Sequence, residues 1–467
     1  MTSSHQNHTP AAEEHFDLII IGTGSGNSIP SPEFDDQKIA IIEKGTFGGT
    51  CLNVGCIPTK MYVYAADIAL AAREAGRLGL DAQVNSVDWD SIVDRVFTNR
   101  IDQIAKGGEQ YRRGEETPNI TVFDEHARFI GPKTIQTGEH VITGEQIVIA
   151  AGSRPVIPEV YAKSGVKYYT NEDIMRMDHQ PQSLIVVGGG YIAMEFAHVF
   201  DGLGTEVTVV NRSETLLRHL DDDLSSRFNQ IARDRFDVRI ANGTQLEKTD
   251  KGVRLELDDG TSIEAEAILV ATGRTPNGDQ MDVDKAGIEL LADGRVKTDE
   301  FGRTTAEGVW ALGDVSSPYM LKHVANAEMR SVQHNLLHPE DLRPLPHDNV
   351  PAAVFTHPQI ATVGRTEKQA REEGFDVTVK VQNFGDVAYG WAMEDKTGIC
   401  KLVADRATGQ LLGAHLMGPQ ASTLIQQLIT AMAYSLDIRE FTRNQYWIHP
   451  ALPEVVENAL LGLEWQK

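Results

Sequence analysis

Two cysteines five positions apart are the residues of this sequence with the clearest capacity for chemistry. Cys51 and Cys56 lie in the run GGTCLNVGCIPTK at residues 48–60, and the only other cysteine is Cys400. In an ideal α-helix, residues five apart lie roughly 9 Å from each other at Cα, whereas a disulfide needs about 4.4–6.8 Å. If the pair bonds, the segment must bend away from regular helix, and Gly55 makes that bend less costly.

The setting of the pair favours redox chemistry. The sequence has no secretory leader, so we expect a cytoplasmic, reducing location, where a close cysteine pair is more often catalytic or metal-binding than structural. No second Cys/His cluster with ligand spacing lies nearby, and we predict no metal site. The interpretation is a redox-active pair, with a structural or inert pair as the alternative.

Length and charge limit the classes of partner. At 467 residues the chain has ample core, and its net charge of −24 argues against nucleic acid and against an anionic membrane surface. No apolar run approaches the ~20 residues of a membrane span. Residues 1–14, rich in His, Glu and small polar types, are predicted to be a disordered tail.

A first dinucleotide site is predicted near the N-terminus. Residues 16–21 read as a buried parallel strand, and a second strand at 38–42 ends at Glu43, where an acid would bind a free ribose hydroxyl, as in FAD. Between them, three glycines would let the backbone approach a diphosphate: Gly22, Gly24 and Gly26. Asn27 stands where the third glycine of the fingerprint belongs, and Pro30 and Pro32 predict a short, broken crossover.

A second dinucleotide site follows the strand at 184–187. Its turn and helix start contain the fingerprint positions Gly188, Gly190, Tyr191 and Ala193. The next strand, 206–210, is followed by Arg212 and then Arg218 rather than by an acid. Arginines there favour the 2′-phosphate of NADPH, whereas the alternative is that both are solvated surface charges.

The remaining segments give an organisation for the whole chain. Helical periodicity spans 60–112, strands follow at 120–149, and a helix at 321–337 could face a cofactor with its N-terminus. We predict an α/β fold with two Rossmann-like dinucleotide-binding domains, for FAD and NADPH, and a C-terminal α+β domain. The predicted segments are 15–155 (FAD), 156–277 (NADPH), 278–345 (FAD and central) and 346–467 (C-terminal dimerisation).

Near the C-terminus, a histidine lies beside a helix start. Pro453 suits the first helical position and Glu454 the first turn. The bend at the prolines could return Glu454 to the ring of His449, which would make that histidine a proton carrier for a thiol. A histidine beside a proline is otherwise usually structural.

These motifs together resemble the flavoprotein pyridine nucleotide–disulfide oxidoreductases over essentially the whole chain. The run at 48–60 is typical of the class that contains glutathione reductase, lipoamide dehydrogenase and mercuric reductase, and ATGRTPN, ALGD and HPALPE occur in the expected order. Within it, GTGSGNS, LKHVANAE and IHPALPEVVENAL resemble the branch that reduces mycothiol disulfide. The resemblance implies FAD, NADPH, a homodimer and a small disulfide substrate, with mycothione favoured.

The resemblance also implies roles for individual residues. Cys51 would attack substrate, Cys56 would lie against the flavin, and His449 with Glu454 would form an acid–base pair from the partner subunit. Lys60 and Glu195 match an ion pair beside the flavin, and Tyr191 matches the ring that shields it. The implied cofactor contacts also include Glu43, Thr50, Asp314, Gly273 and Arg274.

Three alternatives stay open at this stage. Lipoamide dehydrogenase would favour an acid at position 211, where this chain has asparagine. A glutathione or mercuric reductase is possible, although mercury handling usually requires an extra cysteine pair near a terminus. A non-enzymatic scaffold subunit that holds FAD is disfavoured by the set of Cys51, Cys56 and His449.

Overall fold

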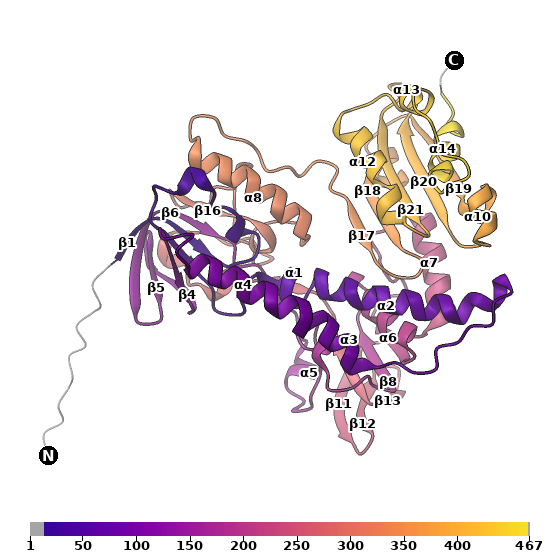
Figure 1. Cartoon of the computed structure of the whole chain (residues 1–467), viewed down its shortest axis with the longest axis horizontal. Coiled ribbons are helices and arrows are strands. Elements are labelled where there is room, and N and C mark those ends of the chain that lie inside the picture. Colours follow the sequence, from indigo (N-terminus) through magenta and orange to yellow (C-terminus); the bar gives the residue numbers. More distant parts are fainter. Residues whose placement is uncertain (1–13, 466–467) are drawn as a thin grey trace, which may run out of the picture. The chain divides into compact units, whose positions relative to one another are not determined.

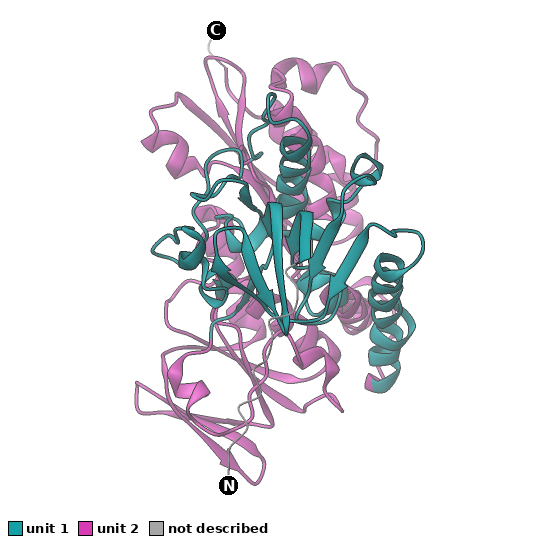
Figure 2. Ribbon diagram, turned by 90° about the vertical axis from the view of Figure 1, so that its left-hand side faces the viewer, with its two compact units in different colours: residues 1–58, 90–156, 274–346 teal, residues 59–89, 157–273, 347–467 magenta. Residues whose placement is uncertain are grey.

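The chain divides into two compact units, each described here by itself (Figure 2). The computed structural model describes residues 14–465. Unit 1 comprises residues 1–58, 90–156 and 274–346, and unit 2 comprises 59–89, 157–273 and 347–467. The predicted tail lies outside the described residues except for Glu14, which begins the first strand and corrects the tail boundary. The predicted domain segments stay predictions.

A seven-stranded sheet forms the centre of unit 1 (Figure 1). Its order is β3-β2-β1-β6-β5-β4, with β16 paired to β6. The strands β1 and β2, β1 and β6, and β6 and β16 are parallel. Their central stretches, residues 18–21, 39–42, 147–149 and 309–311, read as continuous apolar runs because they are buried on both faces. The strands are β1 (Glu14–Ile21), β2 (Ile39–Ile42), β3 (Ile120–Phe123), β4 (Ala127–Gly131), β5 (Thr134–Thr137), β6 (His140–Ile149) and β16 (Val309–Ala311).

The crossover from β1 to β2 contains no α-helix, as Pro30 and Pro32 predicted. Two 3₁₀ turns replace it, η1 (Gly26–Ser28) and η2 (Pro32–Phe34). The α-helices of unit 1, within the described residues, are α1 (Gly49–Asn53), α3 (Trp89–Val96, apart from its first residue), α4 (Asp102–Arg113) and α8 (Lys322–Leu337). A buried arginine of α4, Arg112, donates to the side chain and carbonyl of Asn27, so α4 supports the crossover.

Unit 2 contains a second parallel sheet of order β10-β9-β8-β14. The helix between its first two strands is α6 (Tyr191–Leu203), and a three-stranded antiparallel sheet β11-β12-β13 follows. The elements of this region are β8 (Ser183–Val187), β9 (Glu206–Asn211), α7 (Asp222–Arg235), β10 (Asp237–Ile240), β11 (Gly243–Thr249), β12 (Gly252–Leu257), β13 (Ser262–Ala265) and β14 (Ala267–Val270).

The C-terminal part of unit 2 is an antiparallel sheet of order β17-β18-β21-β20-β19 with helices packed against it. This arrangement fits the predicted α+β character, and Cys400 is fully buried in its core. The elements are β17 (Ala352–Val354), β18 (Ile360–Gly364), α9 (Glu367–Glu372), β19 (Val377–Asn383), β20 (Ile399–Asp405), β21 (Leu411–Met417), α12 (Gln426–Ala433), α13 (Ile438–Arg443) and α14 (Pro453–Leu461). Unit 2 also contains α2 (Cys56–Glu74), apart from its first three residues.

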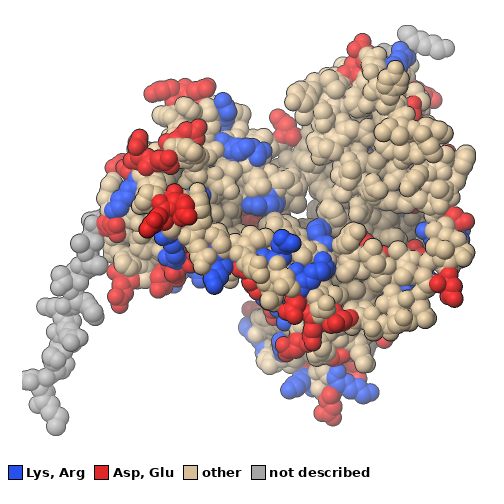
Figure 3. All heavy atoms as spheres, in the orientation of Figure 1, with Lys and Arg blue, Asp and Glu red and all other residues tan. Residues whose placement is uncertain are grey.

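Surface charge is mixed on the face drawn in Figure 3, where acidic and basic side chains are interspersed. Among the residues that the structure describes, no helix combines the length and the apolarity that crossing a bilayer requires.

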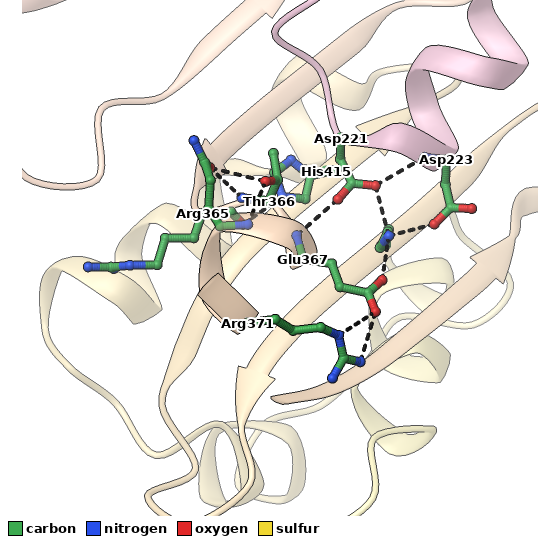
Figure 4. A network of polar contacts seen from close by, with 9 residues as sticks. Asp221, Asp223, Arg365, Thr366, Glu367, Arg371 and His415 are labelled. Atoms are coloured by element: carbon green, nitrogen blue, oxygen red, sulfur yellow. Dashed lines mark hydrogen bonds and ion pairs between the residues drawn. The ribbon is translucent and has the colours of Figure 1, made fainter. Parts of the chain in front are cut away.

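A buried lysine joins two parts of unit 2. Lys401 on β20 is 2% exposed at its side chain and forms ion pairs with Asp221 at 2.8 Å, Glu367 at 2.8 Å and Asp223. Figure 4 shows these carboxylates converging from the start of α7 and from α9. Burial acts to raise the pKa of Asp221, but hydrogen bonds from Lys401 and the Glu367 amide outweigh it and lower that pKa. The cluster therefore holds three carboxylates around one buried ammonium.

The variant Lys401→Met tests this cluster. Removing the cation leaves Asp221, itself 2% exposed, as a buried charge without its main partner, and we expect the free energy of unfolding to fall by about 3 kcal/mol. Because the native pKa of Asp221 is lowered, its contribution is present above the ordinary carboxyl pKa of about 4 and is lost below it. The difference between wild type and variant should therefore hold from pH 7 to about 4 and shrink below that pH.

Urea unfolding, followed by tryptophan fluorescence at each pH, measures the free energy of unfolding of wild type and Lys401→Met. Lys396→Met, at an exposed lysine of the same region, is the matched control and should change stability little. An equal stability loss in both variants, or a loss independent of pH, would contradict the role given to Lys401.

Candidate redox site

The cysteine segment bends as the sequence predicted. Helix α1 ends at Asn53, Val54 adopts φ −142° and ψ 17°, and α2 begins at Cys56. A side chain at Gly55 would place its Cβ 2.8 Å from the Thr50 carbonyl oxygen, so this bend requires glycine. The break brings the Cys51 side chain into a hydrogen bond with Cys56.

The two cysteines are free thiols in this structure, and Cys51 is activated. The hydrogen bond with Cys56 is the main cause that lowers the pKa of Cys51 to about 7, and the charge of Lys322 acts in the same direction against burial. Burial alone raises the pKa of the Cys400 thiol. The nucleophilic form of a thiol is the thiolate. Of Cys51 and Cys400, Cys51 is therefore the reactive cysteine at neutral pH.

A small network of hydrogen bonds connects the cysteine segment to the first glycine-rich turn. Glu43 accepts hydrogen bonds from the Thr23 amide at 2.9 Å and the Thr23 hydroxyl at 2.6 Å, and Thr23 Oγ1 accepts from the Gly48 amide at 2.8 Å. A Cβ at Gly49 would lie 2.6 Å from Gly24 Cα, and Gly49 has a φ of +72°. Helix α1 can therefore begin directly against the turn only because position 49 is glycine.

The first turn fits a dinucleotide. Gly22, at φ +102°, would carry a Cβ 2.4 Å from the Ala150 carbonyl oxygen, and one at Gly26 would lie 2.7 Å from Ala150 Cβ. A Cβ at Gly24 would meet no atom within 4 Å, so the backbone there is open to a ligand. Glu43 at the end of β2 has further lone pairs for a ribose hydroxyl beyond the bonds from Thr23. These residues fit FAD, and their individual contacts with it stay a prediction.

Two more predicted cofactor residues of unit 1 belong to one network. Ser153 donates to Asp314 Oδ2 at 2.6 Å and accepts from Arg274 Nε at 2.7 Å. The Gly313 amide donates to Glu328, a fully buried carboxylate on α8, at 2.7 Å. Asp314 is therefore held directly by Ser153, while Glu328 fixes the residue before it.

The second glycine-rich turn, in unit 2, has the same design with a regular helix. Gly188 has a φ of +128°, and a Cβ added there would lie 2.3 Å from the Ala271 carbonyl oxygen. A Cβ added at Gly190 would meet no atom within 4 Å. Tyr191 is the first residue of α6 and is 39% exposed, and Ala193 is fully buried. Gly273, with a φ of +139°, leads out of this domain.

The predicted coenzyme arginines lie at the end of β9. The Asn211 amide donates to the Ser213 carbonyl at 2.7 Å, so this side chain bonds its own loop. Arg212 and Arg218 are both exposed, and neither forms an ion pair with a residue that the structure describes. Two such arginines are suited to bind a phosphate.

Two further predicted pairs form within unit 2. Lys60 forms an ion pair with Glu195, whose other oxygen accepts from the Phe355 amide at 2.9 Å, and the ammonium lies 4.5 Å from the Phe355 ring centroid. His449 Nδ1 bonds Glu454 Oε1 at 2.7 Å, and the Glu454 pKa is lowered chiefly by that bond. The expected return of Glu454 to the histidine ring is thus present.

The structure places the predicted residues in both units and adds some that sequence reasoning missed. Unit 1 contains both cysteines and the predicted FAD residues Gly22, Gly24, Gly26, Glu43, Thr50, Asp314 and Arg274, and unit 2 contains the remaining ones. Among the missed residues are Thr23, Asn53 and Lys322. Asn53 Nδ2 donates to the carbonyls of Phe47 at 3.0 Å and Gly49 at 3.1 Å, so it fixes the loop before α1. A motif search could have flagged Asn53, because it lies between the two cysteines.

Comparisons with known proteins agree with this geometry. The family models of the pyridine nucleotide-disulphide oxidoreductases and of their dimerisation domain match residues 16–330 and 350–460. Mycothione reductase of Mycobacterium tuberculosis is 55% identical over 96% of this chain and 100% of its own. Glutathione reductase of Burkholderia cepacia is 31% identical over 94% of this chain and 97% of its own. The flavoprotein disulfide reductase RclA of Escherichia coli has a TM-score of 0.84 at 26% identity, covering 96% and 100% of the two chains.

The pKa of Cys51 can be tested by alkylation. In dithiothreitol-reduced holoenzyme, the iodoacetamide reaction at Cys51 should rise with pH around a midpoint of about 7, since only the thiolate reacts. Cys56→Ala removes the main hydrogen bond and should move that midpoint upward by roughly one unit or more. Peptide mass spectrometry assigns the site, and buried Cys400 is the internal control. A midpoint near 9 in wild type, or one unmoved in the variant, would show that Cys56 does not activate Cys51.

Proposed function

Because this chain belongs to the pyridine nucleotide–disulphide oxidoreductase family, we propose that it reduces mycothione to mycothiol with electrons from NADPH. Membership confirms the predicted α/β class and the predicted enzyme, an FAD-dependent disulfide reductase that uses NAD(P)H. The preference for NADPH and the identity of the disulfide are the proposed parts, as is a cytoplasmic location.

One observation supports the substrate. The identity to mycothione reductase of M. tuberculosis is 55%, against 31% to a glutathione reductase and 33% to the mercuric reductase of Staphylococcus aureus. All three align over more than nine-tenths of this chain, so the difference does not come from partial coverage. The sequence segments at residues 22–28, 321–328 and 448–460 resemble the same branch.

The chain's own residues account for the thiol half of the reaction. FAD, when bound, takes electrons from the nicotinamide and supplies them to the cysteine pair. The Cys51 thiolate then attacks one sulfur of the substrate disulfide, which forms a mixed disulfide and expels one thiolate. His449 donates a proton to that leaving thiolate. Cys56 attacks Cys51, which releases the second thiol and closes the Cys51–Cys56 bond.

The proton donor is held by its partner carboxylate. Glu454 accepts from His449 Nδ1 at 2.7 Å and from the Ala451 amide at 3.1 Å, which leaves Nε2 for proton transfer. We infer that this pair serves the cysteines of the partner subunit in a homodimer. Tyr446 and Ile448 support this, since both side chains are largely exposed beside His449. A monomer in sedimentation at working concentration, or full turnover by His449→Ala, would contradict the inference.

The ion pair of Lys60 and Glu195 is proposed to lie beside the flavin. Glu195 is 6% exposed and bound to both Lys60 and the Phe355 amide, so its carboxylate is fixed. Loss of Lys60 leaves the buried Glu195 carboxylate without its cation, and charge-neutral variants at either position should slow flavin reduction by NADPH in stopped-flow measurements. Unchanged reduction rates would remove these residues from the cofactor site.

A substrate comparison tests the proposed function. Purified holoenzyme with NADPH should reduce mycothiol disulfide with a kcat/KM at least about a hundredfold above that for glutathione disulfide, lipoamide or mercuric ion. The variant Cys51→Ser is the control and should lose disulfide turnover while its flavin is still reduced by NADPH. Comparable kcat/KM for mycothione and glutathione disulfide would reject the substrate, while leaving the enzyme class intact.

Coenzyme choice is tested by the two arginines. Replacing both Arg212 and Arg218 by Gln removes the fork-shaped donors for a 2′-phosphate, so KM for NADPH should rise roughly ten- to a hundredfold while KM for NADH changes little. Arg233→Gln, at another arginine of the same domain, is the matched control. Equal use of NADPH and NADH by the wild-type enzyme would defeat this assignment.

A further inference from the structure

The first glycine-rich turn lacks the element that usually binds a diphosphate. It leads into η1, a 3₁₀ turn of 3 residues, whereas the second turn leads into α6 with 13 residues. A dinucleotide diphosphate ordinarily receives positive charge from the amides at the N-terminus of such a helix. A single 3₁₀ turn aligns too few peptide dipoles to supply it. The FAD diphosphate therefore needs positive charge from elsewhere in unit 1.

Lys322, the first residue of α8, brings a cation to this turn. Its Nζ donates to Ser25 Oγ at 2.8 Å, and Ser25 Oγ donates to Asn326 Oδ1 on the next turn of α8 at 3.0 Å. Ser25 directly follows Gly24, whose backbone faces open space. The ammonium is thus anchored one residue from Gly24, where the predicted FAD site is open.

The charge of Lys322 has no direct counter-ion. The side chain is half-buried, and among the residues that the structure describes no carboxylate lies within ion-pair distance of it. Burial accordingly lowers the Lys322 pKa, with Asp314 and the two thiols acting on it only at longer range. Lys60 and Lys401, by contrast, each pair with carboxylates. A partly buried cation without a partner is unfavourable unless an anionic ligand compensates it.

We propose that Lys322, anchored on Ser25, is the counter-charge for the FAD diphosphate and replaces the helix N-terminus that the crossover lacks. An ammonium has three donors, and the Ser25 contact uses one, so donors remain for phosphate oxygens. Lys322 acts here in binding and takes no part in electron transfer. The proposal rests on FAD use by this family and is independent of which disulfide is reduced.

Ligand binding to the full-length protein, freed of flavin, tests the proposal. Lys322→Met keeps the length of the stem and removes the charge. It should weaken FAD and ADP, which both carry a diphosphate, by roughly ten- to a hundredfold, and leave adenosine within about twofold. Lys322→Arg should retain most of the affinity. Lys297→Met, at an exposed lysine of unit 1 paired with Glu289, is the control and should bind all three ligands as wild type.

Fluorescence quenching gives the FAD affinity, and calorimetry gives those of ADP and adenosine. Circular dichroism verifies the fold of each variant. If Lys322→Met does not fold, Ser25→Ala removes the anchor instead and should lower FAD affinity about three- to tenfold. Wild-type FAD affinity should also fall with added KCl, and less steeply in the variant.

Three results would overturn the proposal. The first is FAD affinity of Lys322→Met within about twofold of wild type. The second is an equal loss of ADP and adenosine, which would mean a distorted site rather than a lost charge. The third is unchanged FAD affinity of Lys322→Met together with a higher pH midpoint for alkylation of Cys51. That result would mean that the charge of Lys322 acts on the thiols rather than on FAD. A protein that binds FAD as expected but does not reduce mycothione would refute only the proposed substrate.

Discussion

The close approach of Gly49 to Gly24 fixes where the redox chemistry of this chain takes place. A Cβ at position 49 would come within 2.6 Å of Gly24 Cα, so the cysteine helix can lie against the glycine-rich turn only without a side chain there. Thr23 completes the connection by bonding Glu43 on one side and Gly48 on the other. The predicted ribose ligand, the diphosphate turn and the start of α1 are thereby one bonded assembly, and Cys51 follows two residues later.

Charges in the two units are compensated in different ways. In unit 2, Lys60 and Lys401 pair with carboxylates, and Glu454 bonds the ring of His449. These groups are therefore held in place without any ligand. In unit 1, Lys322 has the Ser25 hydroxyl as its only direct partner among residues 14–465, and its field reaches the Cys51 thiol. Fixed pairs suit groups that must stay oriented during turnover, whereas an uncompensated cation suits a site completed by an anion.

Local patterns in the sequence predicted much of this structure. The parallel strands of both glycine-rich turns, the bend at Gly55, the broken crossover and the contact of Glu454 with His449 all follow from residues close together in the chain. Lys322 and Thr23 escaped notice because their roles arise from contacts between segments far apart in sequence. Lys401 lies in an apolar strand and is understandable only once Asp221 and Glu367 are seen around it. Likewise, no pattern indicated that residues 59–89 pack with unit 2 rather than with the cysteine segment that precedes them.

The most direct test of the account is the absorption of two single-cysteine variants. The account places Cys56 against the flavin and Cys51 toward the substrate. Cys51→Ser should therefore keep a long-wavelength thiolate–flavin charge-transfer band while losing disulfide turnover, and Cys56→Ser should lose the band. The reverse pattern, with the band retained in Cys56→Ser and absent in Cys51→Ser, would contradict the assignment of the two thiols.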